Sequence, residues 1–189
     1  MRFCVRCLRA PTSAIDRGGA AAPYVPPLRQ IVHALKYDDR RALAVPLARL
    51  MRERTTGLLD AVDWVVPVPL HPVRRLVRGF NQAEELAHAL GRPVLDALQR
   101  TRATRVQADL PAAQRHDNVA GAFHLRQPRW TSWRRHVVAD RVRGACVLLV
   151  DDVRTTGATL EACAYALKVA GAREVRTLTA ASVETTRPR

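Results

Sequence analysis

The sequence predicts an α/β fold in which helices flank a parallel sheet, and two parts of the chain lead to this class. The apolar run 145–150 is followed by a polar loop at 151–159, a helical pattern ending near Ala170 and a second apolar run from Val175 to Val183. This strand–loop–helix–strand order defines a βαβ unit, whose strands are parallel. The proline-bounded apolar run 64–69 predicts another buried strand.

The N-terminal part of the chain predicts an arm followed by two helices. Residues 1–27 lack periodicity and end in a proline-rich turn, so we expect a short arm there. From Leu28 the apolar residues fall at helical spacing, at Leu28, Ile31, Val32 and Leu35. A second helix is expected from about Arg40 to Arg54, and Gly57 provides a stop.

The central part of the chain predicts a loop, a helix and a long polar stretch. Residues 70–79 form the loop expected after the strand 64–69. A helix follows from about Asn81, with its inward face made by Ala83, Leu86, Ala87 and Leu90. Residues 93–98 are interpreted as a further strand. The arginine-rich stretch 99–120 lacks apolar periodicity, and residues 124–143 are expected to form a surface loop or hairpin.

Composition places the chain among single-domain globular proteins. It has 189 residues, of which 48% are hydrophobic, enough to bury a core without disulfides. No apolar run approaches the roughly 18–20 residues that cross a bilayer, and the N-terminus lacks the apolar stretch of a secretory signal. Four cysteines without an export signal favour a reducing compartment. We therefore expect a cytoplasmic protein that does not insert into membranes.

The formal net charge is +14, and nearly all of the positive charge is arginine. Arginine binds planar oxyanions through its guanidinium fork better than lysine does. Such a surplus fits nucleic acid, a polyphosphate small molecule or an arginine-rich proteome bias. Composition alone leaves these three explanations open.

The loop 151–159 has the residues of a phosphate site at the carboxyl end of a predicted parallel strand, where ligands bind in open sheets. Threonine hydroxyls and a glycine allow close approach, and the N-terminus of the following helix adds free N–H groups and a positive dipole end. The adjacent carboxylates of Asp151 and Asp152 can accept hydrogen bonds from vicinal hydroxyls or hold a divalent cation through water. A phosphate close to a diol indicates a ribose 5-phosphate.

Other phosphate-binding motifs match this loop less well. A P-loop requires a lysine that is missing here, and a dinucleotide fingerprint requires three spaced glycines where Gly157 stands alone. Phosphotransfer phosphatases use Asp-x-Asp rather than adjacent aspartates. The alternative without a ligand is a strand end followed by a threonine-capped helix with solvated aspartates, and it stays open at this stage.

The run 147–159, VLLVDDVRTTGAT, resembles the binding motif for 5-phosphoribosyl 1-pyrophosphate (PRPP) in type I phosphoribosyltransferases. Residues 66–72 (VPVPLHP), 78–82 (RGFNQ) and 107–110 (QADL), with the helix end 35–37 (LKY), resemble the ComF family of competence-linked proteins. Arg115, Asn118 and residues 121–123 continue that match, which covers about residues 24–183. The resemblance implies a type I phosphoribosyltransferase fold. Its small helical and coil hood would span residues 28–60, and its core residues 61–189.

The resemblance also implies roles for individual residues. Asp151 and Asp152 would bind the ribose hydroxyls directly or through Mg²⁺. The 5-phosphate would be enclosed by Thr155, Thr156, Gly157, Ala158 and Thr159. The pyrophosphate loop would include Pro69, Leu70, His71, Arg78 and Gly79, with Arg78 in direct contact. His71 itself is expected to structure the loop or to lie beside the ligand rather than to act as a general base. The stretch 104–120 would be the mobile loop that closes over the site, with Arg115 bringing positive charge to the leaving group. Arg154 would either help to bind phosphate or point to solvent, and we favour solvent.

The implied reaction is displacement of pyrophosphate at the anomeric carbon, which needs positioning and charge stabilisation more than a protein nucleophile. Mg²⁺ is the expected cofactor because it binds phosphate oxygens. The acceptor and the oligomeric state are not indicated by the sequence. The alternative function is a PRPP sensor without turnover, or a protein that handles single-stranded DNA in natural transformation together with competence-machinery proteins.

Two remaining features are the cysteines and the tryptophans. Members of the resembled family often carry an N-terminal zinc ribbon, but Cys4 and Cys7 supply only two of the four ligands that a structural zinc site needs. A complete Zn²⁺ site is therefore not expected in this chain. Trp130 and Trp133 lie among arginines, which fits stacking on single-stranded bases or, alternatively, a surface loop packed on the domain.

Overall fold

The computed structural model describes residues 13–101, 121–126 and 132–183, and for residues 132–136 only the backbone. In chain order its elements are β1 (Arg17–Pro23), α2 (Leu28–Tyr37), the 3₁₀ helix η1 (Arg41–Leu43), α3 (Ala44–Arg54), β2 (Trp64–Pro67), α4 (Pro72–Arg78), α5 (Gln82–Ala89), β3 (Leu98–Arg100), β4 (Phe123–Leu125), α7 (Ser132–Val142), β5 (Cys146–Arg154), α8 (Ala158–Val169) and β6 (Glu174–Ser182).

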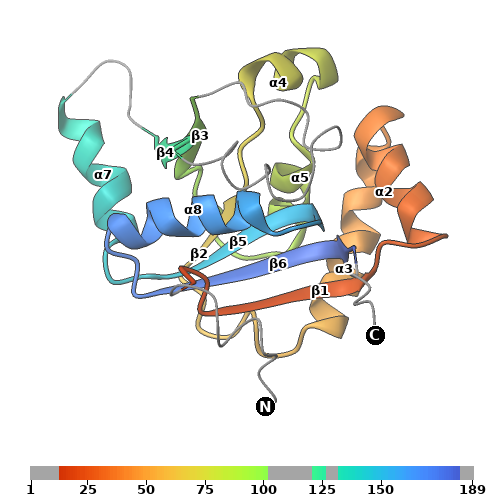
Figure 1. The fold of residues 1–189 in the computed structure, drawn as a ribbon, viewed down its shortest axis with the longest axis horizontal. Coiled ribbons are helices and arrows are strands. Elements are labelled where there is room, and N and C mark those ends of the chain that lie inside the picture. Colours follow the sequence, from red (N-terminus) through yellow and green to blue (C-terminus); the bar gives the residue numbers. More distant parts are fainter. Residues whose placement is uncertain (1–12, 102–120, 127–131, 184–189) are drawn as a thin grey trace.

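The central sheet has four parallel strands in the order β1-β6-β5-β2 (Figure 1). Strands β5 and β6, nine residues each, are the longest of these and lie in its middle. An isolated parallel bridge between Val65 and Val94 extends the sheet beyond β2. Strands β3 and β4 form a separate antiparallel pair. The predicted parallel sheet flanked by helices is confirmed.

Helices cover both faces of this sheet, and the alternation of β5 side chains explains the two layers. Leu148 and Val150 belong to the apolar cluster that also contains residues of α2, α3 and α5. Val147 and Leu149 point the other way and pack in the cluster with α8 and the end of α7. Because successive strand residues face opposite sides, one continuous apolar run serves both layers.

Most elements with clear periodicity occur where the sequence predicts them. The helix expected from Leu28 is α2, the helix expected over 40–54 is η1 followed by α3, and the helix expected from Asn81 is α5. The strand expected over 64–69 is β2, and the predicted βαβ unit is β5–α8–β6. Two strand boundaries differ by more than one residue, since β2 ends at Pro67 and β5 continues through the two aspartates to Arg154.

The expectation of an arm over residues 1–27 is wrong for its second half, because residues 17–23 form the edge strand β1. This strand consists mainly of glycine and alanine, so it lacks the β-branched and aromatic residues that mark a strand. Pairing with β6 explains the small residues: a Cβ atom on Gly18 would collide with the Thr177 hydroxyl. Residues 1–12, including Cys4 and Cys7, lie outside the described residues.

Three other expectations need correction. The loop expected over 70–79 contains the helix α4, which begins after His71 and ends at Gly79. Its apolar side chains are exposed, so it has no inward-facing stripe that would reveal it. Residues 124–143 contain the strand β4 and the helix α7, a polar helix. The strand expected over 93–98 is reduced to the bridge at Val94 and to β3, which starts at Leu98 and runs antiparallel to β4.

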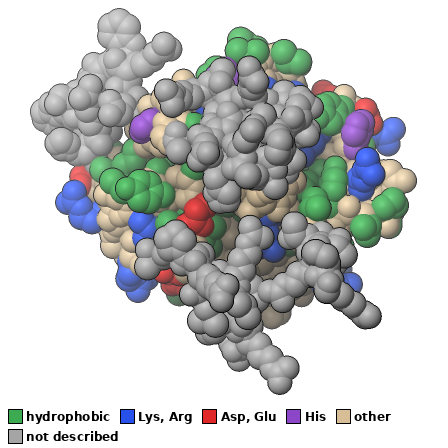
Figure 2. All heavy atoms as spheres, in the orientation of Figure 1, with side chains coloured by type: hydrophobic (Ala, Val, Ile, Leu, Met, Phe, Trp, Pro, Cys, Tyr) green, Lys and Arg blue, Asp and Glu red, His purple; other side chains and the backbone are tan. Residues whose placement is uncertain are grey.

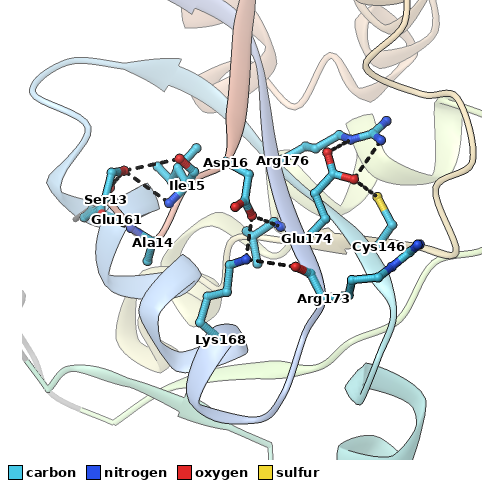
Figure 3. Close-up of polar contacts among 11 residues, drawn as sticks. Ser13, Ala14, Ile15, Asp16, Cys146, Glu161, Lys168, Arg173, Glu174 and Arg176 are labelled. Atoms are coloured by element: carbon cyan, nitrogen blue, oxygen red, sulfur yellow. Dashed lines mark hydrogen bonds and ion pairs between the residues drawn. The ribbon is translucent and has the colours of Figure 1, made fainter. Parts of the chain in front are cut away.

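Polar contacts fasten the N-terminal segment at the amino end of the sheet (Figure 3). The Asp16 carboxylate accepts a hydrogen bond from the Val175 amide at 2.7 Å and pairs with the Lys168 ammonium at 2.6 Å. The Ser13 hydroxyl lies 3.0 Å from the Glu161 carboxylate on α8. These contacts hold the start of β1 against β6 and α8.

Arg176 on β6 links the sheet to the loop that follows α3. Its side chain is 8% exposed, and its guanidinium donates to the carbonyl oxygens of Gly57, Leu58 and Asp60 at 3.3, 3.1 and 2.7 Å. The same guanidinium binds the Glu174 carboxylate through two bonds of 2.7 and 2.9 Å, and Figure 3 shows the pair beside Cys146. These hydrogen bonds lower the pKa of Glu174 to about 2.

None of the helices in the described ranges is long and apolar enough to span a bilayer.

Candidate functional site

A cleft of about 370 Å³ lies beside the carboxyl ends of β2 and β5. Its walls come from parts of the chain that are distant in sequence: Tyr24 after β1, the end of α2, the segment 68–70 after β2, α4 with the start of α5, and the end of β5 with the loop that follows it. Arg100 on β3 also lines it. This is the edge of a parallel sheet at which ligands are expected to bind.

The loop after β5 forms a small hollow of about 50 Å³ next to this cleft. Gly157 has a φ of +81°, a left-handed conformation that an L side chain adopts only with strain, and α8 begins at the next residue. The Thr156 hydroxyl oxygen accepts a long hydrogen bond from the Ala158 amide at 3.4 Å. The first turn of a helix presents N–H groups without intrahelical acceptors, so the hollow is suited to an anion.

Asp151 and Asp152 are the last polar pair on β5 before this loop. The Asp151 carboxylate accepts a hydrogen bond from the Asp152 amide at 2.9 Å, and Asp152 is 8% exposed. Burial, and then the negative charge of Asp152, raise the pKa of Asp151 to about 7. Two carboxylates held this closely have a strong electrostatic requirement for a positive or hydrogen-bond-donating partner.

Lys36, in the last turn of α2, supplies such a partner. Its ammonium nitrogen lies 2.8 Å from Oδ1 of Asp152, and the Lys36 side chain is 18% exposed. Burial lowers the pKa of Lys36, but the charge and hydrogen bond of Asp152 together with the charge of Asp151 outweigh it and raise the pKa overall. A cation from the N-terminal helices therefore sits directly at the acid pair of β5.

The Arg78–Gln82 segment connects α4, α5 and α2. The Arg78 guanidinium donates to Oε1 of Gln82 at 3.2 Å and to the Tyr37 hydroxyl at 3.1 Å, and it lies 4.8 Å from the Tyr37 ring centre. Asn81 caps α5 through the Ala83 amide and donates to the Val68 carbonyl at 3.0 Å. The segment thus fixes an arginine at the mouth of the cleft.

Positive charge predominates around the cleft. Besides Lys36 and Arg78, the guanidinium groups of Arg74 and Arg100 line it, whereas the acidic lining consists of Asp151 and Asp152 among the residues described. Burial, followed by repulsion from Arg74, lowers the pKa of Arg100. A ligand with several negative charges would relieve the repulsion among these cations.

The structure brings together most of the residues that the sequence predicts for the site. Seven of them line the cleft: Pro69, Leu70, Arg78, Asp151, Asp152, Thr155 and Thr159. Gly157 and Ala158 line the adjoining hollow. Arg154 borders the hollow and its side chain is exposed, as expected.

Two of the predicted pyrophosphate-loop residues have helix-capping positions. His71 accepts a hydrogen bond from the Val73 amide through Nδ1 at 3.3 Å and so begins α4, consistent with its expected structuring role. Gly79 ends the same helix with a φ of +76°. Neither belongs to the described lining of the cleft. Arg115 and Trp130 lie outside the described residues, as does the side chain of Trp133.

Sequence reasoning missed Lys36, Arg74, Gln82 and Arg100 as individual site residues. Lys36 carried a signal, because the chain has only two lysines among its 31 cationic side chains. Gln82 is 1% exposed, and its Nε2 atom has no hydrogen-bond partner among the described residues. Arg74 and Arg100 lie in arginine-rich segments, and the sequence does not show which of these arginines face the cleft.

The acid pair fits a magnesium ion that is also bound by a ligand. Mg²⁺ is commonly held by one or two carboxylates, with water and substrate phosphates completing its octahedron. Asp151 and Asp152 provide two carboxylates at the cleft. In the described part of the chain no group of three or more His, Cys, Asp or Glu residues lies close enough together to hold a metal ion.

Comparison with known proteins gives consistent matches. A family model described as a phosphoribosyl transferase domain matches residues 76–189. DNA utilization protein YhgH of Escherichia coli K12 is 37% identical over 184 residues, covering 92% of this chain and 74% of that protein. Competence protein F of Haemophilus influenzae is 30% identical over 185 residues, covering 93% and 76%.

A solved structure of glutamine phosphoribosylpyrophosphate amidotransferase from B. subtilis has a TM-score of 0.46 with 22% sequence identity, covering 74% of this chain and 26% of that one.

Proposed function

Since the chain belongs to the ComF family of phosphoribosyltransferase-domain proteins, we propose that it binds 5-phosphoribosyl 1-pyrophosphate with Mg²⁺ and transfers the phosphoribosyl group to an acceptor. Its fold is the type I phosphoribosyltransferase fold. One observation carries the proposal: the acid pair of β5 and the anion-binding hollow at the start of α8 border one cleft. A phosphate site next to a diol site matches a sugar 5-phosphate.

In this proposal each wall of the cleft acts on one part of the ligand. The backbone N–H groups and hydroxyls of the loop 155–159 bind the 5-phosphate. Asp151 and Asp152 accept hydrogen bonds from the ribose hydroxyls, which fixes the sugar ring and the direction of its anomeric carbon. Positioning of this kind accounts for a large part of the rate of a displacement that requires no protein nucleophile.

The arginines of the cleft act on the leaving group. Arg78 is held at the mouth by Tyr37 and Gln82, and Arg74 and Arg100 add two further guanidinium groups. They would balance the negative charge that accumulates on the leaving oxygen as the glycosidic bond lengthens. When bound, Mg²⁺ would neutralise the pyrophosphate oxygens, with Asp151 and Asp152 as the residues that hold it.

Calorimetric titration with PRPP and Mg²⁺ tests this proposal. We expect saturable binding to the wild-type protein and a loss of at least tenfold in affinity in Asp152→Asn. Asp140→Asn is the matched control, because Asp140 is an exposed acid on α7. Equal PRPP affinities of wild type and Asp152→Asn would contradict the assignment of the acid pair, and no PRPP binding at all would refute the proposed ligand.

A second candidate function is supported by the names of the relatives, a DNA utilization protein and a competence protein. In it the chain is a PRPP sensor without turnover, or it handles single-stranded DNA in natural transformation. The net charge of +14 is compatible with a polyanion. Binding of single strands that weakens steeply with salt and is reduced by changing Trp130 and Arg134 would favour it. Acceptor-dependent pyrophosphate release, abolished in Asp152→Asn, would favour the enzyme.

A further inference from the structure

We propose that Lys36 completes a diol-binding site with Asp151 and Asp152, donating hydrogen bonds to the hydroxyl oxygens of the sugar while the carboxylates accept the hydroxyl protons. The inference rests on the proposed function, because it assumes that a 5-phosphorylated sugar occupies the cleft. It assigns to the N-terminal helices a direct part in recognising that sugar. It also predicts discrimination between a sugar with two vicinal hydroxyls and its deoxy analogue.

The first observation behind this inference is the position of Lys36 in the cleft. The residue lies in the last turn of α2, more than a hundred positions before the acid pair, yet its ammonium is 2.8 Å from Asp152 Oδ1. Lys36, Asp151 and Asp152 all line the same cleft. A salt bridge that served only to dock α2 would not need to open onto a cavity of ligand size.

The second observation concerns the hydrogen-bond donors and acceptors of the side chains and of the sugar hydroxyls. An ionised carboxylate only accepts hydrogen bonds, whereas a hydroxyl group both donates and accepts. When both carboxylates are ionised, Asp151 and Asp152 alone would therefore leave the lone pairs of two sugar hydroxyls without donors. An ammonium group has three N–H donors. Asp152 uses one of those on Lys36, and among the residues described the other two have no acceptor.

The third observation is that position 36 has a lysine rather than an arginine. The chain uses lysine only twice and arginine at its other cationic positions. A guanidinium facing a carboxylate tends to bind it through two parallel N–H groups in one plane. An ammonium is a compact point charge whose donors point in three directions, so one group can serve a carboxylate and two hydroxyl oxygens. Lysine is therefore the residue that this geometry requires.

The test compares two ligands that differ in one hydroxyl. Ribose 5-phosphate and 2-deoxyribose 5-phosphate are titrated by calorimetry in EDTA, so that neither pyrophosphate nor a metal ion contributes. The proteins are wild type, Lys36→Met, Lys36→Arg and Lys168→Met. Lys168 is the other lysine of the chain and pairs with Asp16 at the amino end of the sheet, so its replacement is a matched control. Thermal unfolding confirms that each variant is folded.

We expect the wild type and Lys168→Met to bind ribose 5-phosphate about tenfold or more tightly than the deoxy sugar. In Lys36→Met that ratio should fall to about threefold or less, because only the hydroxyl-to-carboxylate bonds remain. Lys36→Arg keeps a cation at Asp152 and therefore protects folding, and its ratio should also fall at least threefold. The wild-type ratio retained in either folded Lys36 variant would overturn the inference and leave the proposed function intact. Failure of the wild type to bind ribose 5-phosphate and PRPP would overturn both.

Discussion

Replacing Arg176 by methionine should destabilise the protein strongly without touching the cleft. The side chain is 8% exposed, donates to three backbone carbonyl oxygens and pairs with Glu174. Methionine fills a similar volume but leaves the carbonyls of Gly57, Leu58 and Asp60 without these donors. The loop that joins α3 to β2 would lose its main attachment to the sheet.

The magnitude follows from the number and the burial of these bonds. Removing one partner of a fully buried pair costs about 3–5 kcal/mol. The Glu174 side chain is 26% exposed and is partly hydrated once its partner is removed. We therefore expect Arg176→Met to lower the free energy of unfolding by about 2–4 kcal/mol. For a chain of this length that corresponds to a decrease in Tm of roughly 5–15 °C.

Urea unfolding followed by circular dichroism measures this change. Arg173→Met is the matched control, because Arg173 is exposed next to the same strand and should change the free energy of unfolding by less than about 0.5 kcal/mol. The hydrogen bonds from Arg176 lower the pKa of Glu174 to about 2 from 4.5, so part of the wild-type stability should disappear as the pH falls through that range. In Arg176→Met that part should be missing. A cost below 1 kcal/mol with an unchanged acid profile would refute the reasoning.

Three further predictions concern the site. Gly157→Ala forces an L side chain into a φ of +81°. We expect it to lower the free energy of unfolding in urea by about 1–2 kcal/mol and to weaken sugar-phosphate binding. An unchanged free energy of unfolding would contradict the expected strain. Burial and then Asp152 raise the pKa of Asp151 to about 7, so the folded protein keeps a proton that the unfolded chain releases near pH 4. Its stability should therefore decline as the pH rises from 4 to 7, and Asp151→Asn should remove that slope and gain on the order of 1–2 kcal/mol at pH 8. Tyr37→Phe removes the hydroxyl that accepts a hydrogen bond from Arg78. It should lower the affinity for PRPP about two- to fivefold and leave the free energy of unfolding unchanged. Equal PRPP affinities would show that Arg78 does not need the Tyr37 hydroxyl.

The sequence predicts the core of this fold well because its apolar patterning is unambiguous. The β5–α8–β6 unit has a continuous apolar run, a helix with helical spacing and a second run, and each appears within a few residues of its expected bounds. Burial of both sheet faces requires such runs, so the pattern and the architecture have one physical cause.

The elements that the sequence did not reveal are those whose stability comes from tertiary contacts. Strand β1 consists of small residues that fit against Thr177 and its neighbours, so its strand character depends on β6 rather than on local propensity. Helix α4 exposes Val73, Leu76 and Val77, and its ends are fixed by the capping residues His71 and Gly79. Figure 2 shows hydrophobic side chains at the top of the molecule, where Figure 1 places α4. Apolar residues that face solvent give no inward periodicity to detect.

The residues of the site also fall into those that the sequence reveals and those that only the tertiary fold brings together. The loop 151–159 is predictable because a phosphate site built on consecutive backbone groups must be contiguous in sequence. Lys36 and Arg100 reach the same cleft from a helix more than a hundred residues upstream and from a separate strand pair. No spacing rule connects such positions, since only the tertiary fold brings them together. The ComF resemblance includes the helix end 35–37 but does not say what that helix touches.

That helix end explains how the two halves of the proposed site are connected. Lys36 pairs with Asp152 on the sugar side, and the next residue, Tyr37, accepts a hydrogen bond from Arg78 on the pyrophosphate side. Consecutive residues of one helix therefore contact both walls of the cleft. If α2 moved as a unit, sugar recognition and leaving-group charge would change together. A ligand that contacts both walls would hold α2 in place, whereas one that binds only the phosphate hollow would not, so protection of the α2 amides from hydrogen exchange should be greater with PRPP than with inorganic phosphate.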